Sequence, residues 1–286
     1  MRLKCYSPVG QLKMGPERSV QHSKIAVIVL SGASDIAPDL DMFRSSDDST
    51  RTFIRLQYPG WRSYVGESYS AAAIVDDLVG RIQSQVPEGP IYIAGISIGG
   101  HFGYAAALRL QELGRDVAGF CAIDTFMMSS AAPSEGWSKR ALKLASRLML
   151  GLKFTELGEF IRTRFWRACL RLAGDSLPRM LGPYATSGKQ PWVMTLDPSL
   201  ERELSMRLLI QHAAPFVVAL DQNPRPLNVP TVLLRTELNS EDDAAWKLRC
   251  PRALIRQLPG DHQTLLEQQS LGVIREAFVA ATSDWH

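Results

Sequence analysis

The chain has 286 residues, of which 45% are hydrophobic and 21% charged, and its formal net charge at pH 7 is +3. This length suits one sizeable domain with an insertion, and so small a net charge argues against a protein built to bind nucleic acid. No apolar run approaches the ~18 residues that span a bilayer, so we expect no stable membrane insertion.

The N-terminus and the cysteines bear on the cellular compartment. Residues 1–5 are basic, but no apolar segment follows them, so we expect no signal peptide. The four cysteines are widely spaced and form no C-x-x-C pair. This spacing argues against a zinc site or a disulfide framework and favours a reducing, cytoplasmic environment.

Strands and helices alternate in the first part of the chain. After a polar arm over residues 1–22, β-branched and apolar runs predict strands at 24–30, 52–56, 91–94 and 117–123. Helical spacing predicts helices over 70–86 and from 101 to about 114, where Gly114 suits a C-cap.

The pattern changes after Asp124. Residues 126–225 are mostly helical, with candidate helices at 137–152, 155–172 and 198–218; strands return at 229–235 and 253–258, and a last helix is expected at 265–281. We therefore predict an α/β fold with a mostly parallel, doubly wound sheet. Its core comprises residues 23–125 and 226–286, and a helical lid is inserted at 126–225.

The segment Gly95-Ile96-Ser97-Ile98-Gly99 fits the pattern G-x-S-x-G between a predicted strand and a predicted helix. That context is typical of a nucleophile elbow. The turn is tight enough to require glycines beside the serine. We therefore expect the Ser97 hydroxyl to project from the C-terminal edge of the sheet as a nucleophile.

A serine needs a base within hydrogen-bond reach to be a good nucleophile. Of the five histidines, His262 is the candidate, because it follows the last predicted strand and precedes the last helix. The alternative is a loop histidine that caps this helix. The others are less well placed: two near the chain ends, one in the elbow helix and one in the lid (His22, His286, His101 and His212).

The base needs a buried carboxylate to fix its tautomer. Asp124 ends the strand that follows the elbow helix, so strand adjacency places it near Ser97. The rival is an acid after the 229–235 strand, and Asp261 is expected to brace its own loop. The rival candidates are Glu237, Glu241, Asp242 and Asp243.

An oxyanion hole needs two backbone donors. One is expected to be the N–H of Ile98, directly after the nucleophile. The other is expected from the turn after the first core strand, where Ala33 is the first choice and Gly32 the second.

Basic residues gather in the predicted lid. Residues 135–189 hold eleven Lys and Arg against four acids, an excess of +7, whereas the rest of the chain is net −4. This segment is a solvated helical face, a docking surface for an acidic partner or a surface that contacts a membrane. The apolar residues of the lid either pack its own core or line a substrate pocket; they include Phe160, Phe165, Trp166, Leu170 and Trp192.

Together these motifs resemble the thioesterase domains that release products from nonribosomal peptide and polyketide synthases. Gly89-Pro90-Ile91-Tyr92 before the elbow, Gln57-Tyr58-Pro59-Gly60 and Gly260-Asp261-His262 match segments of that family. The chain departs from the family in having Ile98 after the serine, where an aromatic residue is common, and in a longer insertion.

The resemblance implies an α/β-hydrolase fold and a catalytic triad of Ser97, Asp124 and His262. It implies hydrolysis of an acyl, peptidyl or polyketide thioester carried on the phosphopantetheine arm of a carrier protein or synthase, through an acyl-Ser97 intermediate and without a metal or cofactor of its own. The alternatives are a macrocyclase or acyltransferase that releases the chain to another nucleophile, a generic carboxylester hydrolase, and a non-enzymatic binding module with a relic elbow.

Overall fold

One parallel sheet forms the centre of the molecule. The computed structural model describes residues 25–33, 51–65, 70–127, 154–236, 240–262, 265 and 271–285. Six strands pair in the order β2-β1-β3-β4-β5-β6, and every neighbouring pair is parallel. The strands are β1 (Ile25–Leu30), β2 (Arg51–Leu56), β3 (Ile91–Ile96), β4 (Val117–Ile123), β5 (Thr231–Arg235) and β6 (Ala253–Gln257).

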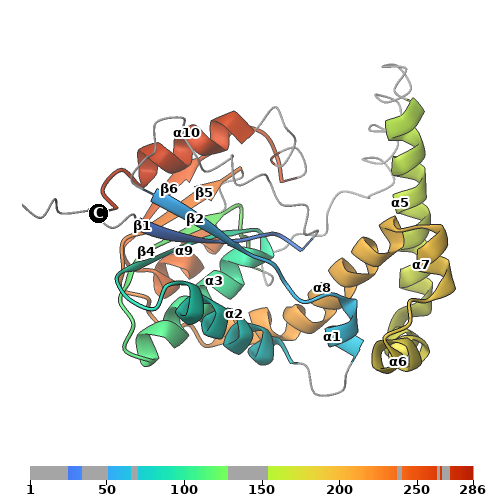
Figure 1. Ribbon diagram of the computed structural model, residues 1–286. Helices are drawn as coiled ribbons and strands as arrows, with labels where there is room; N and C mark the ends of the chain where they lie inside the picture. Colours follow the sequence, from blue (N-terminus) through green and yellow to red (C-terminus); the bar gives the residue numbers. More distant parts are fainter. Residues whose placement is uncertain are drawn as a thin grey trace, which may run out of the picture.

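Helices cover both faces of this sheet, with α10 on one face and α2, α3 and α9 on the other (Figure 1). The helices of the core are α1 (Trp61–Val65), α2 (Ala71–Gln85), α3 (Ile98–Glu112), α9 (Ser240–Arg249) and α10 (Leu271–Ala281). The predicted doubly wound α/β fold is therefore confirmed.

Alternation along β1 separates two apolar cores. Val27 and Val29 pack in a cluster with Phe278 of α10, whereas Ile28 and Leu30 pack in the cluster that contains α2 and α3. Successive side chains of a strand point to opposite faces, so a strand buried on both faces reads as the continuous apolar run seen in the sequence.

The helices between β4 and β5 form an insertion, described over residues 154–222. It contains α5 (Phe154–Ala173), a 3₁₀ turn η2 (Gly174–Ser176), α6 (Leu177–Ser187), α7 (Trp192–Leu196) and α8 (Ser199–Gln222). The long helix α8 contacts α1 and α2 of the core and α5 and α7 of the insertion, and it connects the two parts in Figure 1.

The expected strands and helices agree with the described ones to within a few residues, but four helices were not expected. Helices α1 and α7 have only five residues each, which is too few to show a periodic pattern. Helix α6 contains Pro183 and begins beside a second proline, and α9 begins with a polar run. The predicted arm at 1–22, the helix at 137–152 and the segment 266–270 lie outside the described residues.

The sheet order has a switch point between β1 and β3, because β2 and β4 lie on opposite sides of this pair. Ligands of doubly wound sheets bind at such a point, beyond the carboxyl ends of the strands. Ser31–Ala33 follows β1 and Ser97 follows β3, so both lie at this position. Within the described part of the chain no helix is long and apolar enough to cross a membrane.

Candidate active site

Ser97 occupies the turn between β3 and α3 with a backbone φ of 53°. Its N–H donates to the carbonyl of Ile123 (2.8 Å), and its own carbonyl accepts from the N–H of Gly100 (3.0 Å) and the hydroxyl of Thr125 (2.8 Å). A non-glycine residue in this conformation costs about 1–3 kcal/mol and persists only where its surroundings fix it. Three hydrogen bonds fix the backbone of Ser97.

The three glycines around Ser97 are required by space. A Cβ atom on Gly95 would lie 2.2 Å from the carbonyl oxygen of Gly99, and one on Gly99 would lie 2.5 Å from the carbonyl oxygen of Ser31. A Cβ atom on Gly100 would lie 2.1 Å from the Thr125 hydroxyl oxygen. The glycines therefore let α3 start directly against β3, the β1 turn and the residue that follows Asp124.

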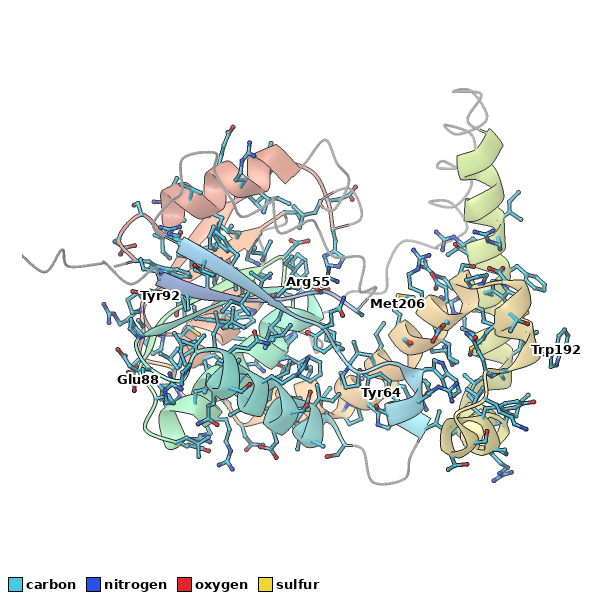
Figure 2. The ribbon with its side chains drawn as sticks, viewed as in Figure 1. Arg55, Tyr64, Glu88, Tyr92, Trp192 and Met206 are labelled. Carbon is cyan, nitrogen blue, oxygen red and sulfur yellow. The ribbon has the colours of Figure 1, made fainter. Side chains whose placement is uncertain are left out.

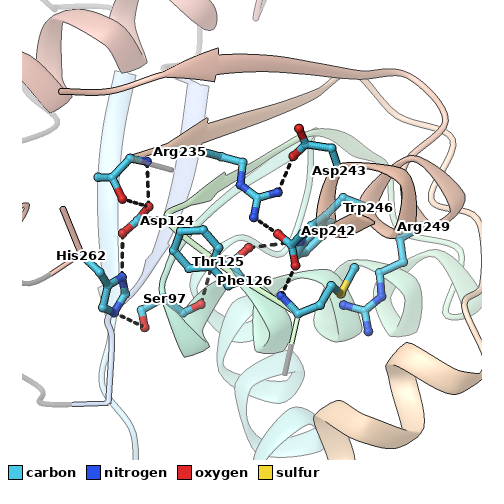
Figure 3. Close-up of polar contacts among 12 residues, drawn as sticks. Ser97, Asp124, Thr125, Phe126, Arg235, Asp242, Asp243, Trp246, Arg249 and His262 are labelled. Atoms are coloured by element: carbon cyan, nitrogen blue, oxygen red, sulfur yellow. Dashed lines mark hydrogen bonds and ion pairs between the residues drawn. The ribbon is translucent and has the colours of Figure 1, made fainter. Parts of the chain in front are cut away.

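His262 connects Ser97 to Asp124 (Figure 3). Its Nε2 lies 3.3 Å from the Ser97 Oγ, and its Nδ1 lies 2.6 Å from the Asp124 Oδ2. Because a carboxylate only accepts, Nδ1 carries the proton and Nε2 presents its lone pair to the Ser97 hydroxyl. The imidazole side chain is 49% exposed, whereas the Asp124 side chain is fully buried.

Both oxygens of Asp124 are engaged. While Oδ2 faces His262, Oδ1 accepts from the N–H and from the hydroxyl of Thr236, each at 2.8 Å. Asp124 also has a positive φ, of 51°; among the described residues, positive φ outside glycine occurs at Ser97 and Asp124 alone. Backbone strain of this kind is concentrated at functional sites. Here it occurs at the two residues that His262 connects by its ring nitrogens, Ser97 and Asp124.

The rival acids that follow β5 and have described side chains, Asp242 and Asp243, lie in α9 and pair with Arg235, not with His262. Asp242 also accepts from the N–H of Met127. Glu237 lies outside the described residues, and so does the side chain of Glu241. Of the candidate acids whose side chains are described, Asp124 is the one in contact with His262.

Arg235 and Thr236 are the residues at this site that sequence reasoning did not identify. The buried guanidinium of Arg235 lies 4.8 Å from the centre of the Phe126 ring. The Phe126 ring in turn contacts the His262 ring edge-on, with 6.1 Å between the two ring centroids. Burial lowers the pKa of Arg235, while Asp243 and Asp124 oppose this shift. The sequence signal that could have identified Arg235 is its position as a charged residue at the end of an otherwise apolar strand.

His101 and His212 have structural partners instead. The Nε2 of His101 donates to the carbonyl of Phe126 (3.0 Å), and its Nδ1 accepts from Arg249 (3.1 Å). Burial, with the nearby Arg249 charge, lowers the pKa of His101 to about 3. His212 donates to the carbonyl of Tyr64 (2.8 Å). His22 and His286 lie outside the described residues.

The two turns expected to hold an oxyanion lie beside Ser97. Ile98 is the first residue of α3, and a Cβ atom on Gly32 would lie 3.6 Å from the Cβ of Ser97. The next residue, Ala33, borders a cavity of about 300 Å³ between the core and α8. The Tyr58 hydroxyl donates to the carbonyl of Ser31 (3.0 Å) and so ties the loop after β2 to this turn.

The apolar residues of the insertion are less buried than expected. The side chains of Phe165 and Trp192 are 58% and 68% exposed, so the expectation that they pack the core of the lid is wrong for both. Trp166 donates to Asp197, and Leu170 is buried beside a cavity. The side chain of Phe160 is outside the described ones. The spacing of apolar residues does not tell which face of a helix finds a neighbour.

Comparison with known proteins gives a sequence match and a fold match. A family model described as the thioesterase domain matches residues 42–170. The chondramide synthase of Chondromyces crocatus is 40% identical over 65 residues, which is 23% of this chain and 2% of that protein. This chain thus spans only a small part of the length of the curated relative that it matches. Both matches show that the chain resembles thioesterase domains.

Solved thioesterase domains share the fold over nearly the whole of this chain. The NocB thioesterase domain, in a covalent complex with a fluorophosphonate nocardicin G analog, has a TM-score of 0.57 at 18% identity; the match covers 91% of this chain and 95% of that one. The Vlm2 thioesterase domain gives a TM-score of 0.57 at 17% identity and covers 90% and 93%. At these identities the match establishes the α/β-hydrolase architecture.

Proposed function

We propose that this chain is a serine thioesterase that releases an acyl, peptidyl or polyketide chain from a carrier-bound thioester. The observation that carries the proposal is the continuous contact from the Ser97 hydroxyl through His262 to the buried Asp124. The resemblance to thioesterase domains supports a thioester as the substrate bond.

In the proposed reaction the Ser97 Oγ attacks the thioester carbonyl carbon while His262 Nε2 takes the hydroxyl proton. The tetrahedral intermediate collapses to an acyl-Ser97 ester, and the departing sulfur receives the proton from His262. Water then attacks the acyl-Ser97 ester with His262 again as the base, and the acid product leaves as the Ser97 Oγ recovers a proton from His262. Asp124 holds the His262 ring in the required tautomer and stabilises its cation.

The negative oxygen of the tetrahedral intermediate needs donors that are already in place. We assign this role to the N–H groups of Ile98 and Ala33, on the two turns that adjoin Ser97. The cavity that begins at Ala33 is assigned to the part of the acyl chain next to the carbonyl. It passes Tyr58 and Gly60 and reaches Arg202 and Leu209 of α8.

The organisation and partners follow from this assignment. Residues 23–125 and 226–286 form the catalytic core, and residues 126–225 form a lid over the substrate. The partner is an acyl or peptidyl carrier protein or synthase whose phosphopantetheine arm presents the thioester. Because the thioester is already activated, the proposed chemistry uses only groups of this chain and the substrate.

The proposal is tested with an acyl N-acetylcysteamine thioester and a fluorophosphonate probe. We expect hydrolysis by the natural chain and labelling of Ser97, both abolished in Ser97→Ala. Asp124→Asn leaves the geometry similar but favours the wrong His262 tautomer, and we expect the turnover rate to fall by ~10³–10⁴. Unchanged activity in either variant would refute the triad.

The competing reactions differ in product or in leaving group. A macrocyclase or acyltransferase gives a lactone, lactam or amide instead of the free acid, which mass spectrometry of the products distinguishes. A generic carboxylester hydrolase would cleave the oxygen-ester analogue as fast as the thioester. We expect the thioester to be the better substrate and the free acid to be the product.

A further inference from the structure

A second cavity, of about 490 Å³, lies within the insertion between α5 and α8. Its volume is in the range of small-molecule sites, and it borders a different face of α8 from the cavity at Ala33. The described lining residues come from these two helices; they are Arg167, Leu170 and Arg171 of α5 and Glu203, Met206, Arg207, Ile210 and Gln211 of α8.

Positive charge exceeds negative charge around this cavity. Three arginines line it, and Glu203 is the one acid among the lining residues that the structure describes. Glu203 is buried and is already used by Arg167, whose Nε and Nη2 lie 2.6 and 3.1 Å from its two oxygens. Arg171 and Arg207 therefore have no carboxylate from the described part of the cavity wall.

One further observation indicates that Arg207 lacks a full set of partners among the described residues. Its Nε is buried and has no hydrogen-bond partner among them. Positive charges also lie close together here, because the charges of Arg167 and Arg171 add to the effect of burial in lowering the pKa of Arg164. An anion in the cavity would accept from the Arg207 guanidinium, and a buried donor without a partner is unfavourable.

Apart from Gln211, the other described residues of the wall are apolar. Leu170 is buried, while Met206 and Ile210 face the cavity from successive turns of α8. Figure 2 shows Met206 on the flank of α8 turned toward the core, whereas Trp192 points outward from the insertion. The cavity thus offers apolar contact together with guanidinium groups, on the inner rather than the outer part of the insertion.

We propose that this cavity binds a carboxylate or similar anionic group at the distal end of the acyl chain, with Arg171 and Arg207 as the ligands that recognise it. Guanidinium groups match carboxylates through paired, charge-assisted hydrogen bonds, and the apolar wall accommodates the hydrocarbon that leads to the anion. The assignment rests on the proposed thioesterase function and adds a substrate class to it: chains with an anion far from the thioester.

The experiment compares octanedioyl and octanoyl thioesters of N-acetylcysteamine, which differ by one terminal carboxylate. We expect the natural chain to prefer the octanedioyl substrate in kcat/KM by about tenfold or more, as for a charge-assisted hydrogen bond. Arg207→Gln and Arg171→Gln should each reduce this preference, and the double variant should abolish it with little change for octanoyl. Arg162→Gln, on the same helix but paired with Asp197 outside the cavity, is the matched control.

Binding separates this inference from catalysis. Octanedioic acid is titrated calorimetrically into Ser97→Ala, with and without the two arginine substitutions, so the result does not depend on turnover. Binding that the Arg171 and Arg207 substitutions weaken about tenfold and Arg162→Gln leaves intact supports the site even if no thioester is hydrolysed. Equal binding by all variants, or equal kcat/KM for both thioesters, would overturn it.

A third arm uses octanoyl-pantetheine with and without its phosphate. If the phosphate, and not the acyl carboxylate, gives a preference that the double variant loses, the cavity serves the carrier's arm and the assignment to the acyl chain is wrong.

Discussion

Thr236 donates two hydrogen bonds to one oxygen of Asp124, from its backbone N–H and from its hydroxyl, each at 2.8 Å. The other oxygen is thereby left for His262. Because Thr236 follows β5 and Asp124 follows β4, the pairing of these neighbouring strands sets the direction of the carboxylate. Strand register and the orientation of the proposed base are thus linked.

We predict that Thr236→Val lowers kcat/KM for thioester hydrolysis by about tenfold, because it removes one hydrogen bond to a charged group and keeps the side-chain shape. Thr236→Ser retains the hydroxyl and should stay near the natural activity. Thermal unfolding of both variants checks that the fold is kept. Equal activity of the Val and Ser variants would show that the hydroxyl has no positioning role.

Gly99 and Gly80 provide a matched pair for the elbow. A Cβ atom on Gly99 would lie 2.5 Å from the carbonyl oxygen of Ser31, whereas one on Gly80, within α2, would meet nothing within 4 Å. We expect Gly99→Ala to destabilise the fold by at least about 2 kcal/mol through overpacking and to lower activity. Gly80→Ala should stabilise it by about 0.5–1 kcal/mol. Urea unfolding measures both changes, and a stable, active Gly99→Ala would contradict the steric argument.

Much of the fold and of the candidate site could be predicted because the signals are local. A strand buried on both faces appears as a continuous apolar run, and the glycines around Ser97 mark the tight turn directly in the sequence. Asp124 and His262 could be placed because the carboxyl ends of parallel strands share one edge of the sheet.

The remaining features depend on contacts that no local pattern encodes. Thr236 matters because β5 lies beside β4, and Arg235 because its charge meets two acids of the following helix and the Phe126 ring. The exposure of the Trp192 side chain depends on how α7 packs against the neighbouring helices. Spacing identifies an amphipathic helix, but not what covers its apolar face.

His101 makes the stability depend on pH. Its pKa is about 3 in the folded chain and ~6.5 when unfolded, so below pH 6.5 the unfolded chain binds the extra proton and stability falls as the pH decreases toward 3. Arg249, paired with Asp221, is the charged group in contact with the ring.

We expect the protonation of His101 in the unfolded chain to lower the free energy of unfolding by about 2 kcal/mol between about pH 7 and pH 5. His101→Gln can donate to the Phe126 carbonyl and accept from Arg249 without titrating, so it should lose that part of the pH dependence. Denaturant unfolding at both pH values gives the comparison. The same pH dependence in both chains would mean that His101 is not the titrating group.

The positive excess of the insertion predicts salt-sensitive recognition of an acidic carrier. The segment 135–189 carries a net charge of +7, and part of it, the helix α5, presents Arg162 and Arg171 to solvent. Raising the salt from about 0.1 M to about 1 M shortens the Debye length from about 10 to about 3 Å and screens attraction between exposed charges.

We therefore expect KM for a carrier-bound thioester to rise by about tenfold, whereas KM for the neutral octanoyl N-acetylcysteamine thioester changes little. Steady-state kinetics across the salt series tests this, with Arg162→Gln reducing the salt dependence; the same dependence for both substrates would show that the basic face does not dock the carrier.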